Sequence, residues 1–101
     1  MQNHAKVVII GGGVVGCSIL YHLSKFGLKD CILLERNELT SGSSWHAAGN
    51  VHVISSDPNI SRMMAYTIGL YKEIEKESGH SVGFKPSGGF YLASNDVWAD
   101  Y

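Results

Sequence analysis

His46 carries a side chain that could form a bond with another molecule. A neutral imidazole is a competent nucleophile, and it can also carry a proton near neutral pH. His46 lies in the segment Leu39–Gly49, which is rich in serine, glycine and alanine. On composition alone, such a segment is more typical of a turn in which the histidine is hydrogen-bonded to a backbone carbonyl.

A glycine pattern of the form G-x-G-x-x-G precedes that segment, with Gly11, Gly13 and Gly16 at its fixed positions. The first glycine allows a tight turn, the second lets a pyrophosphate approach the backbone, and the third lets the next helix pack closely on a sheet. The free N–H groups at the start of that helix attract an anion. The pattern therefore predicts a site for a dinucleotide.

The surrounding residues predict the elements that this site needs. Residues 5–10 are an apolar, β-branched run typical of a buried parallel strand. Residues 14–26 carry apolar side chains at helical spacing, and Gly27 is a suitable helix stop. Residues 31–34 form a second apolar run. Strand, glycines, helix and strand follow one another in the order of a βαβ unit, so the glycines are more than a turn signal.

Glu35 ends the second apolar run, about 20 residues beyond the third glycine. Its carboxylate can accept hydrogen bonds from the 2′- and 3′-hydroxyl groups of a ribose, and it would repel a 2′-phosphate. NADP is therefore disfavoured. Arg36 follows, and we expect it either beside the adenosine half of the nucleotide or in solvent, where charged residues after a strand usually lie.

Composition excludes several classes of protein. The net charge of −1, without a basic patch, argues against nucleic-acid binding. No apolar stretch reaches the length of a membrane span. Cys17 and Cys31 match no zinc spacing and are expected to be free thiols. With few residues before the first strand, we expect a cytoplasmic protein, or one of the mitochondrial matrix if the chain is eukaryotic and trimmed.

The remaining sequence predicts one more helix and the start of a sheet. Residues 37–57 read as a loop with one short turn, and Asp57 and Gly79 as the two caps of a helix. Residues 84–94 predict two short strands around a Pro-Ser-Gly-Gly turn. Because two strands are only the beginning of a doubly wound sheet, we expect an N-terminal fragment of a larger α/β protein.

We accordingly divide the chain into two incomplete parts. Residues 1–80 are expected to be the first segment of a Rossmann-like, nucleotide-binding fold. Residues 81–101 are expected to begin a second, β-rich domain that carries the substrate site. Side chains that do the chemistry are expected beyond Tyr101, so no catalytic residue is identified within the chain.

Several segments together resemble the N-terminus of the dimethylglycine and sarcosine dehydrogenase group, within the glycine/D-amino-acid oxidase (DAO) superfamily of FAD enzymes. They are Gly11–Gly16, Glu35-Arg36, Leu39–Gly49, Asp57–Gly79 and Gly88–Ala93. The resemblance covers nearly the whole chain, and its most specific element is Ser43-Ser-Trp-His-Ala-Ala-Gly49.

The resemblance implies a set of FAD contacts and one covalent bond. It implies that a ring nitrogen of His46, expected to be Nδ1, is bonded to the 8α-methyl carbon of FAD. Asn50 departs from the family, where an apolar residue is common. The implied FAD-binding positions are Gly11, Gly13, Val14, Val15, Gly16, Glu35, Arg36, Gly42, Ser43, Ser44, Trp45, His46, Ala47, Ala48, Gly49 and Asn50.

The resemblance also implies a reaction, the oxidation of the N-methyl group of an amino acid such as dimethylglycine or sarcosine by hydride transfer to the flavin. Electrons would pass to an electron-transfer flavoprotein or to oxygen, and a further C-terminal domain would bind tetrahydrofolate. Three alternatives stay open: a DAO-type oxidase with noncovalent FAD, a non-catalytic nucleotide-fold fragment, and an NAD dehydrogenase. The Ser43–Gly49 segment argues against the last.

Overall fold

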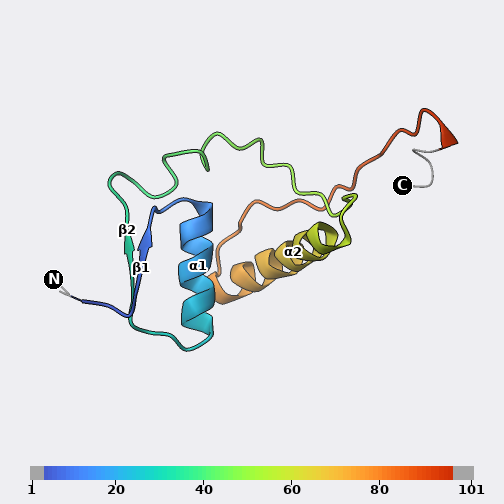
Figure 1. The fold of residues 1–101 in the computed structure, drawn as a ribbon. Helices are drawn as coiled ribbons and strands as arrows, with labels where there is room; N and C mark the ends of the chain where they lie inside the picture. The colour runs from blue at the N-terminus through green and yellow to red at the C-terminus, as the bar shows by residue number, and fades with distance from the viewer. Residues whose placement is uncertain (1–3, 97–101) are drawn as a thin grey trace. The chain divides into compact units, whose positions relative to one another are not determined.

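The computed structural model describes residues 4–96, which fall into two compact units, Met1–Gly49 and Asn50–Tyr101. The elements follow in the order β1, α1, β2 and α2 (Figure 1). The first three belong to the first unit and α2 belongs to the second. The predicted boundary after residue 80 separates a nucleotide-binding part from a substrate-binding part, and it stays a prediction.

The first unit is a βαβ arrangement. Strands β1 (Val7–Ile10) and β2 (Cys31–Leu34) are parallel neighbours, with Val7 opposite Cys31 and Ile10 opposite Leu34. Helix α1 (Val14–Lys25) connects them and packs on both. Parallel strands require a crossover of this kind, so both strands end at the same edge of the sheet. The predicted order of strand, helix and strand is confirmed, and the fold class is α/β.

The covered face of the sheet holds the small core of this unit. Ile9 is buried, and a Cβ atom built on Gly16 at the start of α1 would lie 3.4 Å from Ile9 Cγ2. Successive side chains of a strand point to opposite faces. Val8 and Ile10, which flank Ile9, are accordingly 50% and 87% exposed. Helix α1 therefore covers one face of an apolar strand and leaves the other face bare.

Glycines end both helices. At the end of α1, Gly27 has a φ of +86°, and its N–H donates to the Ser24 carbonyl. At the end of α2 (Pro58–Ser78), Gly79 is in the left-handed region with a φ of +70°, and its N–H donates to the Glu75 carbonyl. This conformation carries no steric penalty in glycine. The two predicted helix ends are confirmed.

Asp57 caps the start of α2. Its Oδ1 accepts hydrogen bonds from the N–H groups of Asn59 and Ile60, at 2.7 and 3.3 Å. Pro58 follows at the first helical position, where its missing N–H costs nothing. Both features match the prediction. Since no helix residue is fully buried, the amphipathic stripe of α2 is only partly covered by the rest of its unit.

The two short strands predicted within residues 84–94 are not formed, which corrects that prediction. Phe90 and Leu92 are almost fully exposed, and no strand pairing occurs there. A strand needs a partner for its backbone groups, and the described part of the chain offers none at this position. The prediction for the last five residues, 97–101, lies outside the described residues.

Candidate nucleotide-binding site

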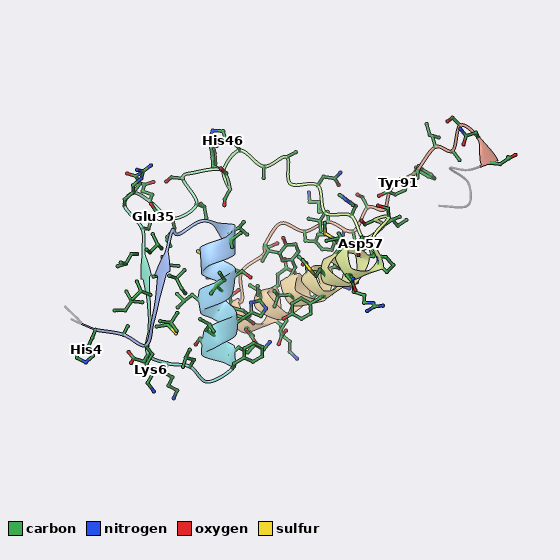
Figure 2. All side chains as sticks on the ribbon, in the orientation of Figure 1. His4, Lys6, Glu35, His46, Asp57 and Tyr91 are labelled. Atoms are coloured by element: carbon green, nitrogen blue, oxygen red, sulfur yellow. The ribbon has the colours of Figure 1, made fainter. Side chains whose placement is uncertain are left out.

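The candidate site residues of the first unit gather at the edge of the sheet where β1 and β2 end. The glycine turn Gly11–Gly13 follows β1, and Glu35 follows β2. The loop that carries His46 continues from Glu35 toward the start of α1 (Figure 2). In open α/β sheets, ligands bind outside the carboxyl ends of the strands. The βαβ unit therefore brings the predicted motifs together at the expected edge.

The glycine turn has the backbone geometry that a phosphate site requires. Gly11 continues the ladder by donating its N–H to the Leu34 carbonyl at 2.8 Å, and its φ of +104° suits glycine alone. Gly13 is the N-cap of α1 and has extended backbone, with no side chain to occupy the helix end. The predicted turn is confirmed, and it delivers the chain directly into the helix N-terminus.

Gly16 is held against the same turn. A Cβ atom on Gly16 would overlap the Gly11 carbonyl oxygen and lie 3.1 Å from the Gly11 carbonyl carbon. Both contacts are with backbone, which cannot rotate away as a side chain can. The predicted reason for this glycine is thus confirmed, with a refinement: the atoms it approaches most closely belong to the glycine turn itself.

Glu35 is bound to the glycine turn by a direct hydrogen bond. Its Oε2 accepts from the Gly12 N–H at 2.7 Å, and its Oε1 accepts from the Asn37 N–H at 2.9 Å. These two hydrogen bonds, with that from Gly12 the more important, lower the pKa of the Glu35 carboxyl below its ordinary value of 4.5. Each oxygen keeps a lone pair, so the ionised group can still accept from a ribose hydroxyl.

The pH dependence of stability should report this hydrogen bond. The pKa of Glu35 is lowered in the folded state. The stability that its ionised carboxylate contributes is therefore fully present above the pKa of the unfolded state, and it is lost as pH falls through the lower pKa of the folded state. We expect Glu35→Gln to be less stable than wild type at pH 7, and the difference to shrink below about pH 4. Denaturant unfolding at a series of pH values measures this difference.

A matched control is Glu38→Gln. The Glu38 carboxylate is exposed, and no hydrogen bond to it is found among residues 4–96. Its removal changes the net charge by the same amount without touching the glycine turn. If the two variants lose the same stability with the same pH profile, the contribution assigned to the Gly12–Glu35 hydrogen bond is wrong.

The loop after Glu35 folds back onto the glycine turn at two points. The Thr40 N–H donates to the Gly12 carbonyl at 2.9 Å, and the Val14 N–H donates to Ser44 Oγ at 2.8 Å. Thr40 has a φ of +65°, which is unfavourable for a β-branched residue. Sequence reasoning missed both contacts, because neither follows from local spacing. The N–H groups predicted to attract an anion at the start of α1 include that of Val14, and in the structure the Ser44 hydroxyl accepts its hydrogen bond.

His46 lies on a short hydrogen-bonded turn and is exposed to solvent. The Trp45 N–H donates to the Thr40 and Gly42 carbonyls, and the His46 N–H donates to the Ser43 carbonyl at 3.1 Å. His46 Nδ1 lies 3.0 Å from the Gly42 carbonyl oxygen. A carbonyl can only accept, so Nδ1 carries the proton in this arrangement and Nε2 carries the free lone pair.

This geometry can be compared with both interpretations of His46 made from the sequence, the turn residue and the attachment point of a flavin. The backbone carbonyl partner that composition suggested is present, and it belongs to Gly42. The same contact makes Nε2 the nucleophilic nitrogen, whereas the family resemblance led us to expect Nδ1. A histidine that donates through one ring nitrogen and exposes the other has its tautomer chosen by its surroundings.

Several of the predicted positions have exposed side chains. Arg36 is exposed, as are Val14 and Val15, whose side chains are 61% and 69% exposed. Trp45 is 77% exposed. Asn50 belongs to the second unit. The remaining exposed loop positions are Gly42, Ser43, Ala47, Ala48 and Gly49.

Within residues 4–96, no group of three or more histidine, cysteine or acidic side chains could hold a metal ion. Neither α1 nor α2 combines the length and the hydropathy that crossing a bilayer demands.

Comparison with known proteins finds one family and a set of similar sequences. The family described as DAO, FAD dependent oxidoreductase, matches residues 6–101. Human dimethylglycine dehydrogenase, mitochondrial, is 46% identical over 99 residues, which are 98% of this chain and 11% of that protein. Human sarcosine dehydrogenase, mitochondrial, is 42% identical over 96 residues, 94% of this chain and 10% of that protein.

The name of a third relative indicates a different substrate. The 4-methylaminobutanoate oxidase (formaldehyde-forming) of Paenarthrobacter nicotinovorans is 40% identical over 93 residues, 92% of this chain and 11% of that protein. The chain thus spans about a tenth of the length of these relatives. The resemblance noted in the sequence is confirmed at the level of the family.

Proposed function

This chain belongs to the family of FAD-dependent oxidoreductases, and from that premise we propose that it forms the nucleotide-binding part of an N-methyl amino acid dehydrogenase or oxidase. The names of its relatives support the substrate class, since dimethylglycine, sarcosine and 4-methylaminobutanoate all carry an N-methyl group on an amino acid. We propose a substrate of this class and leave its identity among them to experiment.

The residues present fit the ADP half of FAD. The residues of the glycine turn place no side chain at the N-terminus of α1. The Val14 N–H there donates to Ser44 Oγ, and an anionic pyrophosphate can approach the remaining N–H groups. The lowered pKa of Glu35 keeps its carboxylate ionised at neutral pH, so both of its oxygens can accept hydrogen bonds from ribose hydroxyl groups. Gly11, Gly13, Gly16 and Glu35 would hold this half of the cofactor. NAD has the same ADP half, and family membership decides in favour of FAD.

We propose that His46 is the covalent attachment point of the flavin. The observation that carries this proposal is the exposed imidazole whose Nδ1 faces the Gly42 carbonyl, because it leaves the Nε2 lone pair free to form a bond. Forming this N–C bond would remove one proton from His46 and one from the flavin methyl group. Dioxygen would take up both protons and the released electron pair as hydrogen peroxide, so atoms and electrons would balance.

The bound flavin would supply the acceptor for a hydride from the N-methyl carbon of the substrate. The residues of this chain bind and orient it, and the substrate-binding side chains are expected elsewhere in a longer protein. Electron-transfer flavoprotein or oxygen would then remove the electrons. A tetrahydrofolate-binding domain and a cytoplasmic location stay predictions.

The proposal is tested on the full-length enzyme. We expect its denatured mass to exceed the mass of the polypeptide by one FAD less two hydrogens, with the addition on the peptide that contains His46. We also expect dimethylglycine or sarcosine to bleach the flavin under anaerobic conditions, while glycine, which has no N-methyl group, should not. A flavin that no N-methyl amino acid reduces would contradict the proposed reaction.

A DAO-type oxidase with noncovalent FAD is the second candidate, because His46 is satisfied as a simple turn residue in the structure. In that case the denatured mass equals that of the polypeptide alone and the flavin is found in the supernatant after acid precipitation. The two candidates therefore differ in one measurement that needs no substrate.

A further inference from the structure

The segment Thr40–His46, which we call the histidine turn, is a single hydrogen-bonded unit. Backbone hydrogen bonds connect Trp45 to Thr40 and Gly42, and His46 to Ser43. The His46 ring is bound to the same turn through the Gly42 carbonyl. The orientation of the imidazole is therefore set within the turn, and its location depends on how the turn is attached to the rest of its unit.

The turn is attached to the glycine turn and α1 by two hydrogen bonds at different positions. At its beginning, the Thr40 N–H donates to the Gly12 carbonyl at 2.9 Å. Near its end, Ser44 Oγ accepts from the Val14 N–H at 2.8 Å. Among the described residues, the second is the only hydrogen bond that a side chain of the turn makes to the glycine turn or α1.

Ser44 makes this contact with α1, whereas Ser41 of the same turn does not. Ser44 is partly buried and lies close to the helix start, since a Cβ atom on Gly13 would be 3.1 Å from Ser44 Oγ. Ser41 is exposed, and its hydroxyl donates to the Glu38 carbonyl at 2.8 Å. These two serines of the histidine turn thus differ in a way that permits a controlled comparison.

We propose that Ser44 is a positioning residue for flavin attachment, which fixes the histidine turn, and with it His46, to the N-terminus of α1. The proposal rests on the covalent attachment proposed above. The α1 N-terminus is where the pyrophosphate is expected, so one hydrogen bond sets the location of the imidazole relative to the bound nucleotide. Loss of it should slow bond formation even when FAD is saturating, because reaction rates fall steeply with small displacements.

The test follows the rate of attachment in the full-length apoprotein after addition of FAD, measured as acid-stable flavin fluorescence on denaturing gels. At saturating FAD we expect Ser44→Ala to react at least about tenfold more slowly than wild type. Ser41→Ala should react within about twofold of wild type, because the Ser41 hydroxyl donates to the Glu38 carbonyl and makes no contact with the glycine turn or α1. Ser44→Thr keeps the hydroxyl and should restore most of the rate.

A second variant of Ser44 distinguishes a role in positioning His46 from a role in capping α1. The same variant provides the test if Ser44→Ala does not fold. Ser44→Asn retains an acceptor that caps helices well, but its longer side chain would shift the turn. We expect it to unfold at the same temperature as wild type and still attach flavin slowly. Attachment at the wild-type rate by Ser44→Asn, or by Ser44→Ala at saturating FAD, overturns the positioning role.

Three further outcomes would overturn the positioning role of Ser44, and the last of them would also overturn the covalent attachment at His46. If Ser41→Ala is slowed as much as Ser44→Ala, the Ser44 contact with α1 is not responsible and the inference is overturned. If Ser44→Ala only weakens FAD affinity, Ser44 is a binding residue and the inference is again overturned. A wild-type protein that never acquires acid-stable flavin, although it binds FAD, overturns the covalent attachment and the role of Ser44 with it.

Discussion

Replacing His46 by alanine is expected to abolish acid-stable flavin completely, from a stoichiometric amount to none. The side chain provides the only nitrogen of the histidine turn with a free lone pair, because peptide nitrogens are not nucleophiles. FAD binding itself should persist, since the glycine turn and Glu35 are unchanged. The measurement compares flavin in the pellet and in the supernatant after acid precipitation of the full-length protein.

The matched control is His52→Ala, which removes another exposed histidine from the same long loop. It should keep its flavin in the pellet. The variant His46→Ala should instead release yellow supernatant while remaining yellow before acid is added. Flavin that coprecipitates with His46→Ala would show that another residue makes the bond, and the proposed attachment would be wrong.

The second large effect is expected at Gly16, where Gly16→Val should prevent the first unit from forming. Even the Cβ atom would overlap the Gly11 carbonyl oxygen, and valine adds two further carbons at the same point. Overpacking commonly costs about 1–3 kcal/mol, and we expect the upper end or beyond because the obstructing atoms are backbone. That is a large fraction of the about 5–15 kcal/mol that stabilises a typical native protein.

The measurement combines flavin content with thermal unfolding of the full-length protein. We expect no bound flavin and a large fall in the unfolding temperature, or insoluble protein. The control is Gly69→Ala within α2, where an added Cβ meets no atom within 4 Å and alanine favours the helix. A Gly16→Val protein with full flavin content would mean that the close approach of Gly16 to Gly11 is not needed.

The parts of the fold that sequence predicts well are those with local causes. Strand β2 coincides with the apolar run 31–34, and α2 begins and ends within one residue of the predicted caps Asp57 and Gly79. Each of these signals depends on residues within a few positions of one another. The order of elements then limits the topology, because parallel strands need a crossover helix.

The contacts that sequence did not predict join residues far apart in the chain. The Gly12–Glu35 and Val14–Ser44 hydrogen bonds span 23 and 30 residues. The motif and the resemblance predict Glu35 and Ser44 as cofactor ligands, and neither indicates that the same side chains also bind the glycine turn and the start of α1. Only the folded backbone brings these donors and acceptors within reach of one another.

The predicted strands within residues 84–94 fail for a related reason. Their side chains have the β-favouring character of a strand, and the Gly88-Gly89 pair resembles a hairpin turn. Strand formation also depends on an available neighbour and a surface to cover. Phe90 and Leu92 remain exposed in the structure because neither condition is met by the described residues of this unit.

The double use of Glu35 limits how the cofactor preference of this fold could be redesigned. A common engineering strategy exchanges the acidic residue after the second strand for a small or basic one, so that a 2′-phosphate is accepted. Here that exchange would also remove the acceptor of the Gly12 N–H and leave a buried donor without a partner. A designer would have to supply a replacement acceptor for Gly12 from another residue before altering the nucleotide that the protein selects.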